Sequence, residues 1–301
     1  MKIKKDINKN IFRAYDIRGV VPTDIDVDTS YTIGLAFGSK LKELGKVKCV
    51  VGHDNRISSP DLHQALIQGL IETGINVYDL SLTTTPMYYY ACIDLNIDSG
   101  IMITASHNPK DENGFKIAFS NFDNAKGKEI TDFYDYIEKG NFVTGKGSIT
   151  KCDVKADYFK ALLDNLSFGN RKVKVVLDPG NGTTSILLDD LFKNVPVSYK
   201  IINGESDGTF PNHHPDPSIE SNLEELKHAV IESKADVGLA FDGDGDRVGI
   251  ISNLGKFVPI DYYMIIIIRD IINKLKNKTF LYDVKCSKSL EDEIIKLGGT
   301  P

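Results

Sequence analysis

The chain has 301 residues, enough for two full domains and part of a third, and 41% of them are hydrophobic and 26% charged, as in soluble globular proteins. Its net charge of -6 argues against a nucleic-acid-binding protein, and its longest apolar run, residues 262–268, is shorter than the roughly 20 residues that span a bilayer. The basic start develops no apolar signal-peptide core, and the four cysteines form no Cys-x-x-Cys pair. We therefore expect a cytoplasmic protein with reduced thiols that binds neither nucleic acid nor membrane.

Strand-like and helix-like segments alternate along the first 150 residues, which is typical of an α/β domain. A stretch rich in Gly, Lys and Thr, residues 140–150, ends this domain. The predicted elements are strands at 48–52, 75–79, 100–104 and 114–119, and helices at 61–73 and 130–138.

The same alternation continues over residues 151–252, so we predict a second α/β domain there. Ser221 and Glu224 have the spacing of a capping box at the start of a helix. The predicted elements are helices at 153–165 and 184–192, a helix after the capping box, and strands at 172–177, 197–202, 237–241 and 248–251.

Residues 253–301 are predicted to contain a strand, a helix, a second strand and a second helix. They end at Gly298-Gly299-Thr300-Pro301, a turn sequence that leads toward a further strand. We therefore expect an incomplete third α/β domain in a chain truncated at its C-terminus.

The sequence Asp242-Gly243-Asp244-Gly245-Asp246 places three carboxylates in one short loop between two predicted core strands. So much negative charge favours a hard divalent cation such as Mg²⁺, and the glycines let the backbone turn the carboxylates inward. Arg247 follows at once, and its guanidinium suits a phosphate group. We predict a magnesium site formed by Asp242, Asp244 and Asp246.

Two other motifs resemble this loop. An EF-hand would need Gly and Glu at the positions of Arg247 and Asn253, so that interpretation fails. A phosphatase with an aspartate nucleophile, of the haloacid-dehalogenase type, also places an Asp-x-Asp after a strand, as Asp242 and Asp244 do, and it stays open as an alternative.

A second cluster, Thr104-Ala105-Ser106-His107-Asn108-Pro109, follows the apolar strand at 100–104. It lacks the glycines of a nucleophile elbow and the Gly-Lys of a P-loop. A phosphorylated Ser106 would add about -1.5 to -2 charge and three acceptor oxygens, which with the three carboxylates would complete an oxygen shell around Mg²⁺. Because the two clusters are far apart in sequence, we expect them to meet in a cleft between domains.

These two clusters, together with the segment from Phe12 to Gly19 and the segments 210–217 and 283–287, resemble the α-D-phosphohexomutase family, in its bacterial phosphomannomutase/phosphoglucomutase branch. The resemblance implies tandem three-layer α/β domains with mixed sheets and an active site in the interdomain cleft. On it, residues 1–150 form the phosphoserine-bearing domain I, 151–252 domain II with the metal-binding loop, and 253–301 part of domain III. The sugar-recognition loop of domain III and the whole of domain IV would be missing.

The resemblance also implies residue roles and an activity. Ser106 would be the phosphoserine and, with Asp242, Asp244 and Asp246, a ligand of Mg²⁺, while Arg247 would hold its phosphate. The remaining implied site residues are His107 and Lys116 for proton transfer, and Tyr15 and Arg18 for substrate binding. The enzyme would interconvert the 1- and 6-phosphates of a hexose, mannose or glucose, through a hexose 1,6-bisphosphate that also serves as activator.

We expect the 301-residue chain to turn over poorly, because the domain that would clamp the non-reacting phosphate of the hexose substrate is not in this sequence. A non-catalytic metal-binding remnant is the main alternative, and the aspartate-nucleophile phosphatase is the weaker one. His213 and His214 stand together like a metal-binding pair, but we interpret them as structural.

Overall fold

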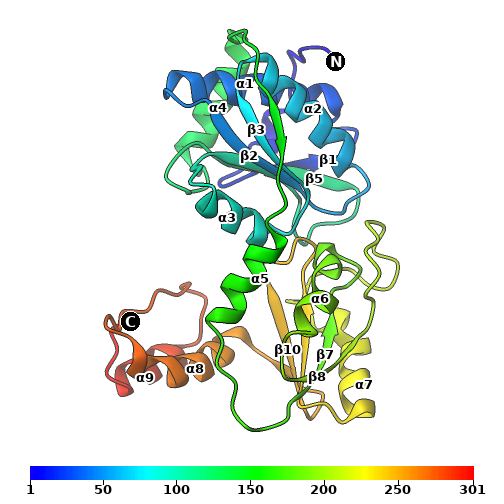
Figure 1. Ribbon diagram of the computed structural model, residues 1–301, viewed down its shortest axis with the longest axis vertical. Coiled ribbons are helices and arrows are strands. Elements are labelled where there is room, and N and C mark those ends of the chain that lie inside the picture. Colours follow the sequence, from blue (N-terminus) through cyan, green and yellow to red (C-terminus); the bar gives the residue numbers. More distant parts are fainter.

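The computed structural model describes residues 1–301 and shows two α/β domains in tandem, followed by a small helical segment (Figure 1). The first domain contains a six-stranded sheet of order β1-β5-β4-β2-β3-β6. Pairing is parallel among β2, β3, β4 and β6 and antiparallel at β5 and β1, so the sheet is mixed. Its strands are β1 Ile17–Val20, β2 Lys48–His53, β3 Asn76–Leu82, β4 Gly100–Ile103, β5 Glu112–Ala118 and β6 Ile149–Lys151.

Both faces of this sheet are covered, which gives three layers. Val51 and Ile101 point to a core shared with α1, α2 and α4, whereas Val50 and Met102, one position away on the same strands, point to a core shared with α3 and α5. This alternation is what a strand buried on both faces requires. The helices are α1 Val27–Glu43, α2 Ser59–Glu72, α3 Thr85–Asp94, α4 Lys128–Lys139 and α5 Lys155–Asp164.

The second domain repeats the plan with a five-stranded mixed sheet of order β11-β10-β9-β7-β8. Val176 packs with helix α7 on one face, and Leu177 with α6 on the other. The elements are β7 Lys174–Asp178, α6 Leu188–Phe192, β8 Ser198–Ile201, α7 Glu224–Ser233, β9 Val237–Phe241, β10 Val248–Ser252 and β11 Phe257–Val258. The predicted α/β fold with mixed sheets is confirmed.

The C-terminal segment consists of α8 Ile260–Ile271 and α9 Lys288–Lys296, which pack through Ile265, Ile268 and Leu290. The strand predicted between these helices is wrong. Only one isolated bridge, between Thr279 and Thr300, forms there, because no neighbouring strand lies alongside to complete a ladder.

The predicted capping box is also wrong. Residues Glu220–Leu223 form a short 3₁₀ turn, so Ser221 lies inside that turn and α7 begins after Leu223, whose side chain cannot cap it. No helix in the structure combines the length and the apolar character that a membrane span requires.

Candidate active site

Ser106 lies in the tight turn between β4 and β5, at the edge of the first sheet that faces the second domain. Its backbone is in the left-handed region, with φ of +53°, and its amide donates to Thr104 Oγ1 at 2.8 Å. Its Oγ donates to Asp242 Oδ2 of the second domain at 2.7 Å and lies 3.3 Å from His107 Nδ1. The structure thus brings together the two clusters that are far apart in sequence.

Arg56, which sequence reasoning missed, organises this turn. It follows β2, is 1% exposed and is paired with Asp54 at 3.2 Å. The ring of Phe210, from the second domain, lies 5.4 Å from the guanidinium carbon. The guanidinium donates to four main-chain carbonyls of the turn and of β5, those of Ser106, Asn108, Pro109 and Glu112. The only signal in the sequence is a charged Asp-Asn-Arg run directly after a buried strand.

The acidic loop connects β9 and β10, as the two predicted core strands imply. Asp242 and Asp244 are fully buried, Asp246 reaches the surface, and one carboxylate oxygen of each lies within 4.8 Å of the others. Gly243 has no room for a side chain, because a Cβ there would lie 2.5 Å from the carbonyl oxygen of Ser106. Gly245 has φ of +79°, a conformation that favours glycine. Both glycines of the motif are therefore needed where they stand.

Two side chains of the first domain reach Asp244. Lys116, on β5, donates from Nζ to Asp244 Oδ2 at 2.8 Å and to Asp246 Oδ2 at 2.7 Å. Thr85, at the start of α3, donates from Oγ1 to the same Asp244 oxygen at 2.6 Å and from its amide to the Asp244 carbonyl at 2.9 Å. Thr85 was not predicted, since one threonine at the start of a helix carries no signal of a partner in another domain.

The pKa values of the two buried aspartates, Asp242 and Asp244, shift in opposite directions. Burial, together with the charges of Asp244 and Asp246, raises the pKa of Asp242 well above its usual range. Burial also opposes ionisation of Asp244, but the ammonium of Lys116 outweighs it and lowers the pKa of Asp244 to about 2. The pKa of Lys116 is raised, because its two carboxylate partners outweigh its burial, so it stays protonated at neutral pH.

The three aspartates fit a magnesium ion. Asp244 Oδ1 is buried and has no hydrogen-bond partner, while Oδ2 of the same carboxylate has two. An unpartnered buried carboxylate oxygen is costly, and a divalent cation would satisfy it. Oxygen donors from aspartates are the ligands that Mg²⁺ prefers.

A cleft of about 300 Å³ opens beside Ser106 and the acidic loop. Most of the predicted site residues line it: Tyr15, Arg18, Ser106, Lys116, Asp246 and Arg247. Arg18 is paired with Asp16 and donates to Asn108, so it is held in place, whereas Tyr15 is 70% exposed. The cleft also contains Tyr89, Asn124 and Lys126, which were not predicted.

His107 and the pair His213–His214 have different environments. Burial and the nearby Arg247 lower the pKa of His107, so its imidazole is neutral at pH 7. His213 Nε2 lies 3.1 Å from the fully buried Asp178, and its Nδ1 lies 3.0 Å from the His214 carbonyl. Both ring nitrogens of His213 therefore have protein partners, which agrees with a structural role.

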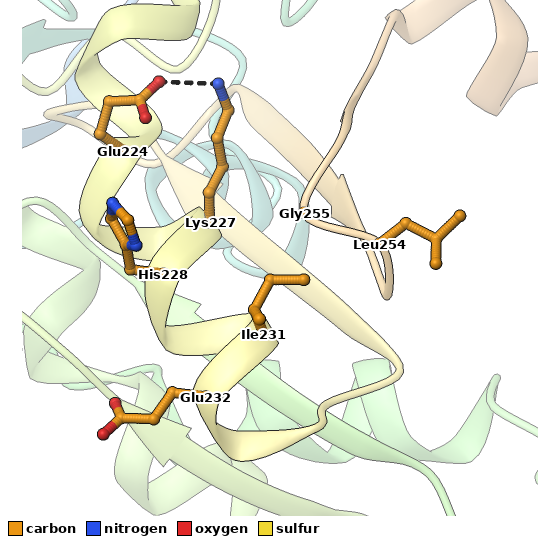
Figure 2. Close-up of a pocket in the computed structure, with 7 residues that line it drawn as sticks. All are labelled: Glu224, Lys227, His228, Ile231, Glu232, Leu254 and Gly255. Atoms are coloured by element: carbon orange, nitrogen blue, oxygen red, sulfur yellow. Dashed lines mark hydrogen bonds and ion pairs between the residues drawn. The ribbon is translucent and has the colours of Figure 1, made fainter.

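Two hollows are larger than this cleft. One, of about 700 Å³, runs from Asp246 and Arg247 to Asp283, Lys285 and Cys286 of the C-terminal segment, so it continues the cleft. Figure 2 shows the other, of about 500 Å³, between α7 and the turn at Leu254 and Gly255. Its one marked interaction is the surface pair of Lys227 and Glu224, and its side chains do not converge on a common point. We therefore place the candidate active site at the cleft of Ser106.

Comparison with known proteins identifies the family of this chain. The family models for phosphoglucomutase/phosphomannomutase match residues 9–143 as α/β/α domain I and residues 156–255 as α/β/α domain II. The chain is 42% identical over 291 residues to a phosphomannomutase/phosphoglucomutase of Pseudomonas syringae, covering 97% of this chain and 62% of the relative. It is 36% identical over 296 residues to a phosphoglucomutase of Neisseria meningitidis, covering 98% of this chain and 64% of the relative.

The crystal structure of a phosphoglucomutase/phosphomannomutase family protein from Burkholderia thailandensis has the same fold, with a TM-score of 0.93 and 35% identity over 98% of this chain and 66% of that one. The chain thus spans less than two thirds of the length of the curated relatives named above. The resemblance drawn from the motifs is confirmed: this chain belongs to the phosphoglucomutase/phosphomannomutase family, in its bacterial branch.

Proposed function

We propose that this chain carries the phosphoryl-transfer site of a phosphohexomutase that interconverts hexose 1-phosphate and hexose 6-phosphate, with mannose or glucose as the sugar. One observation carries the proposal. The Ser106 hydroxyl of the first domain lies 2.7 Å from Asp242 of the second, inside a cluster of three aspartates. A nucleophilic hydroxyl beside a cation site is what phosphoryl transfer needs.

The reaction uses Ser106 as a phosphoryl carrier. Its phosphate is transferred to the free hydroxyl of a hexose monophosphate: the bond from phosphorus to Ser106 Oγ breaks and a bond from phosphorus to the sugar oxygen forms. The sugar hydroxyl gives up its proton to a base at the cleft, and Ser106 Oγ takes up a proton as it leaves. The hexose 1,6-bisphosphate turns round in the cleft and returns its other phosphate to Ser106. The net result is an isomerisation, and the serine ends as it began.

Charged residues around the cleft supply binding and charge stabilisation. Arg247 and Arg18 provide guanidinium groups for the phosphates, and Tyr15 lies at the exposed rim. Neutral His107 can accept a proton from the sugar hydroxyl, whereas protonated Lys116 can donate one, so both remain candidates for proton transfer.

Asp242, Asp244 and Asp246, with the phosphate on Ser106, would hold Mg²⁺. The ion would supply positive charge to the phosphoryl group during transfer. The unpartnered Asp244 Oδ1 supports this assignment.

For the 301-residue chain by itself we propose slow net isomerisation. The family models match domains I and II, and the resemblance puts the clamp for the non-reacting phosphate in a later part of these proteins. Without that clamp, transfer at Ser106 remains possible, but the bisphosphate loses orientation energy. A cytoplasmic location, where sugar phosphates are found, is part of the same proposal.

The test is phosphorylation of the purified chain by glucose 1,6-bisphosphate with Mg²⁺, followed by intact-mass measurement and peptide mapping. The expected result is one phosphoryl group, on Ser106, and none in Ser106→Ala. Intact Mg²⁺ binding without any phosphorylation would favour a non-catalytic metal-binding remnant instead.

Ser106→Ala also tests the phosphatase alternative. An enzyme with an aspartate nucleophile would keep its activity in this variant, whereas a mutase would lose it. The structure gives that alternative little support. Asp242 is fully buried, accepts a hydrogen bond from Ser106 and does not line the cleft, so its carboxylate is not presented to a substrate there.

A further inference from the structure

We propose that Thr85 is a positioning residue for the cation: its hydroxyl holds the Asp244 carboxylate so that the other oxygen faces the metal. The inference rests on the proposed function, because it assumes the magnesium site at Asp242, Asp244 and Asp246. Thr85 lies outside both sequence motifs, and its effect on cation affinity can be measured without turnover.

The hydrogen bonds of Asp244 are divided unequally between its two carboxylate oxygens. Oδ2 accepts from Thr85 Oγ1 at 2.6 Å and from Lys116 Nζ at 2.8 Å, whereas the buried Oδ1 accepts none. Two donors on one oxygen fix the rotation of the carboxylate about its Cβ–Cγ bond. The oxygen left over is the one available to a cation.

Thr85 also fixes the main chain of the same aspartate, because its amide donates to the Asp244 carbonyl at 2.9 Å. Thr85 and Asp244 are both 0% exposed, so water does not compete for these bonds. A residue held at its carbonyl and at its side chain by one partner has little freedom to turn. Partners that orient metal-binding carboxylates in this way commonly contribute 10–100-fold to metal affinity.

The contact also crosses the domain boundary, since Thr85 begins α3 of the first domain and Asp244 belongs to the second. Cation binding and contact between the domains are therefore coupled, and each stabilises the other. Lys116 alone cannot replace Thr85, because its ammonium is shared with Asp246 and would be repelled by an incoming cation.

The test is a calorimetric titration of the unphosphorylated chain with Mg²⁺, repeated with Mn²⁺, for the wild type and three variants. Thr85→Val keeps the shape of the side chain but removes the hydroxyl, and should weaken binding 10–100-fold. Thr85→Ser keeps the hydroxyl and should bind close to the wild type. Thr84→Val is the matched control, because Thr84 caps the same helix by accepting from the Met87 amide and has no hydrogen bond to Asp244. It should lower Tm and leave the dissociation constant unchanged.

The outcomes separate this inference from the function it rests on. Wild-type chain that binds neither ion would overturn the metal site and this inference together. Wild-type binding with equal affinity in Thr85→Val would overturn this inference alone, as would an equal loss of affinity in Thr84→Val, since helix stability would then explain the effect.

A measurement on the wild type alone covers the case in which Thr85→Val does not fold. Mg²⁺ should slow amide hydrogen exchange in the first turn of α3, which contains none of the proposed ligands. Exchange there that is unaffected by saturating Mg²⁺ would contradict the coupling.

Discussion

The two loops that meet at the cleft are held in opposite ways. The turn of Ser106 is fixed from within its own domain, by the four hydrogen bonds of Arg56 to its main chain. The carboxylate of Asp244, in contrast, takes both of its hydrogen bonds from Lys116 and Thr85 of the other domain. The nucleophile is thus preorganised by one domain, whereas the cation site is complete only where the two domains touch.

The largest loss of stability is expected from replacing Arg56, which supports the Ser106 turn. Arg56→Met leaves the buried Asp54 carboxylate without its cation and removes four hydrogen bonds to main-chain carbonyls, so we expect a loss of about 3–5 kcal/mol in the free energy of unfolding. Urea unfolding of the variant and the wild type measures it. A cost of about 0.5 kcal/mol, that of an ordinary surface change, would show that the turn does not depend on Arg56.

A smaller loss of stability is expected from moving the acidic loop away from the Ser106 turn. Gly243→Ala places a methyl group 2.5 Å from the Ser106 carbonyl oxygen, and relieving that overlap should cost about 1–3 kcal/mol. Cation affinity should fall with it, because the acidic loop moves away from Lys116 and Thr85. Gly204→Ala is the control, since its neighbour is the side chain of Ile201 rather than the main chain of another domain. Equal cation affinity in the two variants would contradict the predicted closeness of the loops.

The opposite effect on stability, a gain, is expected from removing the charge of Asp242. Its folded-state pKa is raised, so the ionised carboxylate destabilises the cation-free protein as pH rises above the ordinary range of an aspartate. Asp242→Asn should therefore raise Tm in EDTA at pH 7 and abolish Mg²⁺ binding. Asp244→Asn should lower Tm, because the pKa of Asp244 is depressed to about 2 and its charge stabilises the fold above its ordinary pKa of 3.8. Thermal unfolding of both variants checks the contrast, and shifts of the same sign would refute it.

The smallest expected effect is the pH dependence of phosphoryl transfer, which reports on His107. Since burial and Arg247 lower the pKa of His107, its imidazole should remain neutral below pH 6.5. The rate at which phosphorylated Ser106 transfers its phosphoryl group to glucose 1-phosphate, the step in which the sugar hydroxyl loses its proton, should therefore hold steady until the pH falls through that lowered pKa. Stopped-time measurement of this transfer between pH 5 and pH 8 gives the profile, with His107→Gln as the comparison. A wild-type rate that drops already above pH 6.5 would argue against His107 as the proton acceptor.

The two main features of the candidate site could be predicted because each is a distinctive run of adjacent residues. The acidic loop and the Ser106 turn each combine an apolar strand with an unusual polar run, so their positions followed from a few adjacent residues. Arg56 and Thr85 have no such pattern, because their importance comes from partners about 50 and 159 positions away.

Not every missed element lacked a signal in the sequence. Helix α1 was overlooked although Ile33, Phe37 and Leu41 recur every four residues and form a fully buried apolar stripe. Gly34 lets it approach α2 closely. Strand β6 lies at the end of a stretch that looks like a linker, and only its pairing with β3 makes it a strand.

A crystal structure of the chain soaked with Mn²⁺ would show where the cation binds, since anomalous scattering locates the ion without assumptions. One ion is expected, bound to Asp242, Asp244 and Asp246 and facing the side chain of Ser106. An ion bound elsewhere, or a Ser106 turn that lies remote from these carboxylates, would contradict the proposed phosphoryl-transfer site.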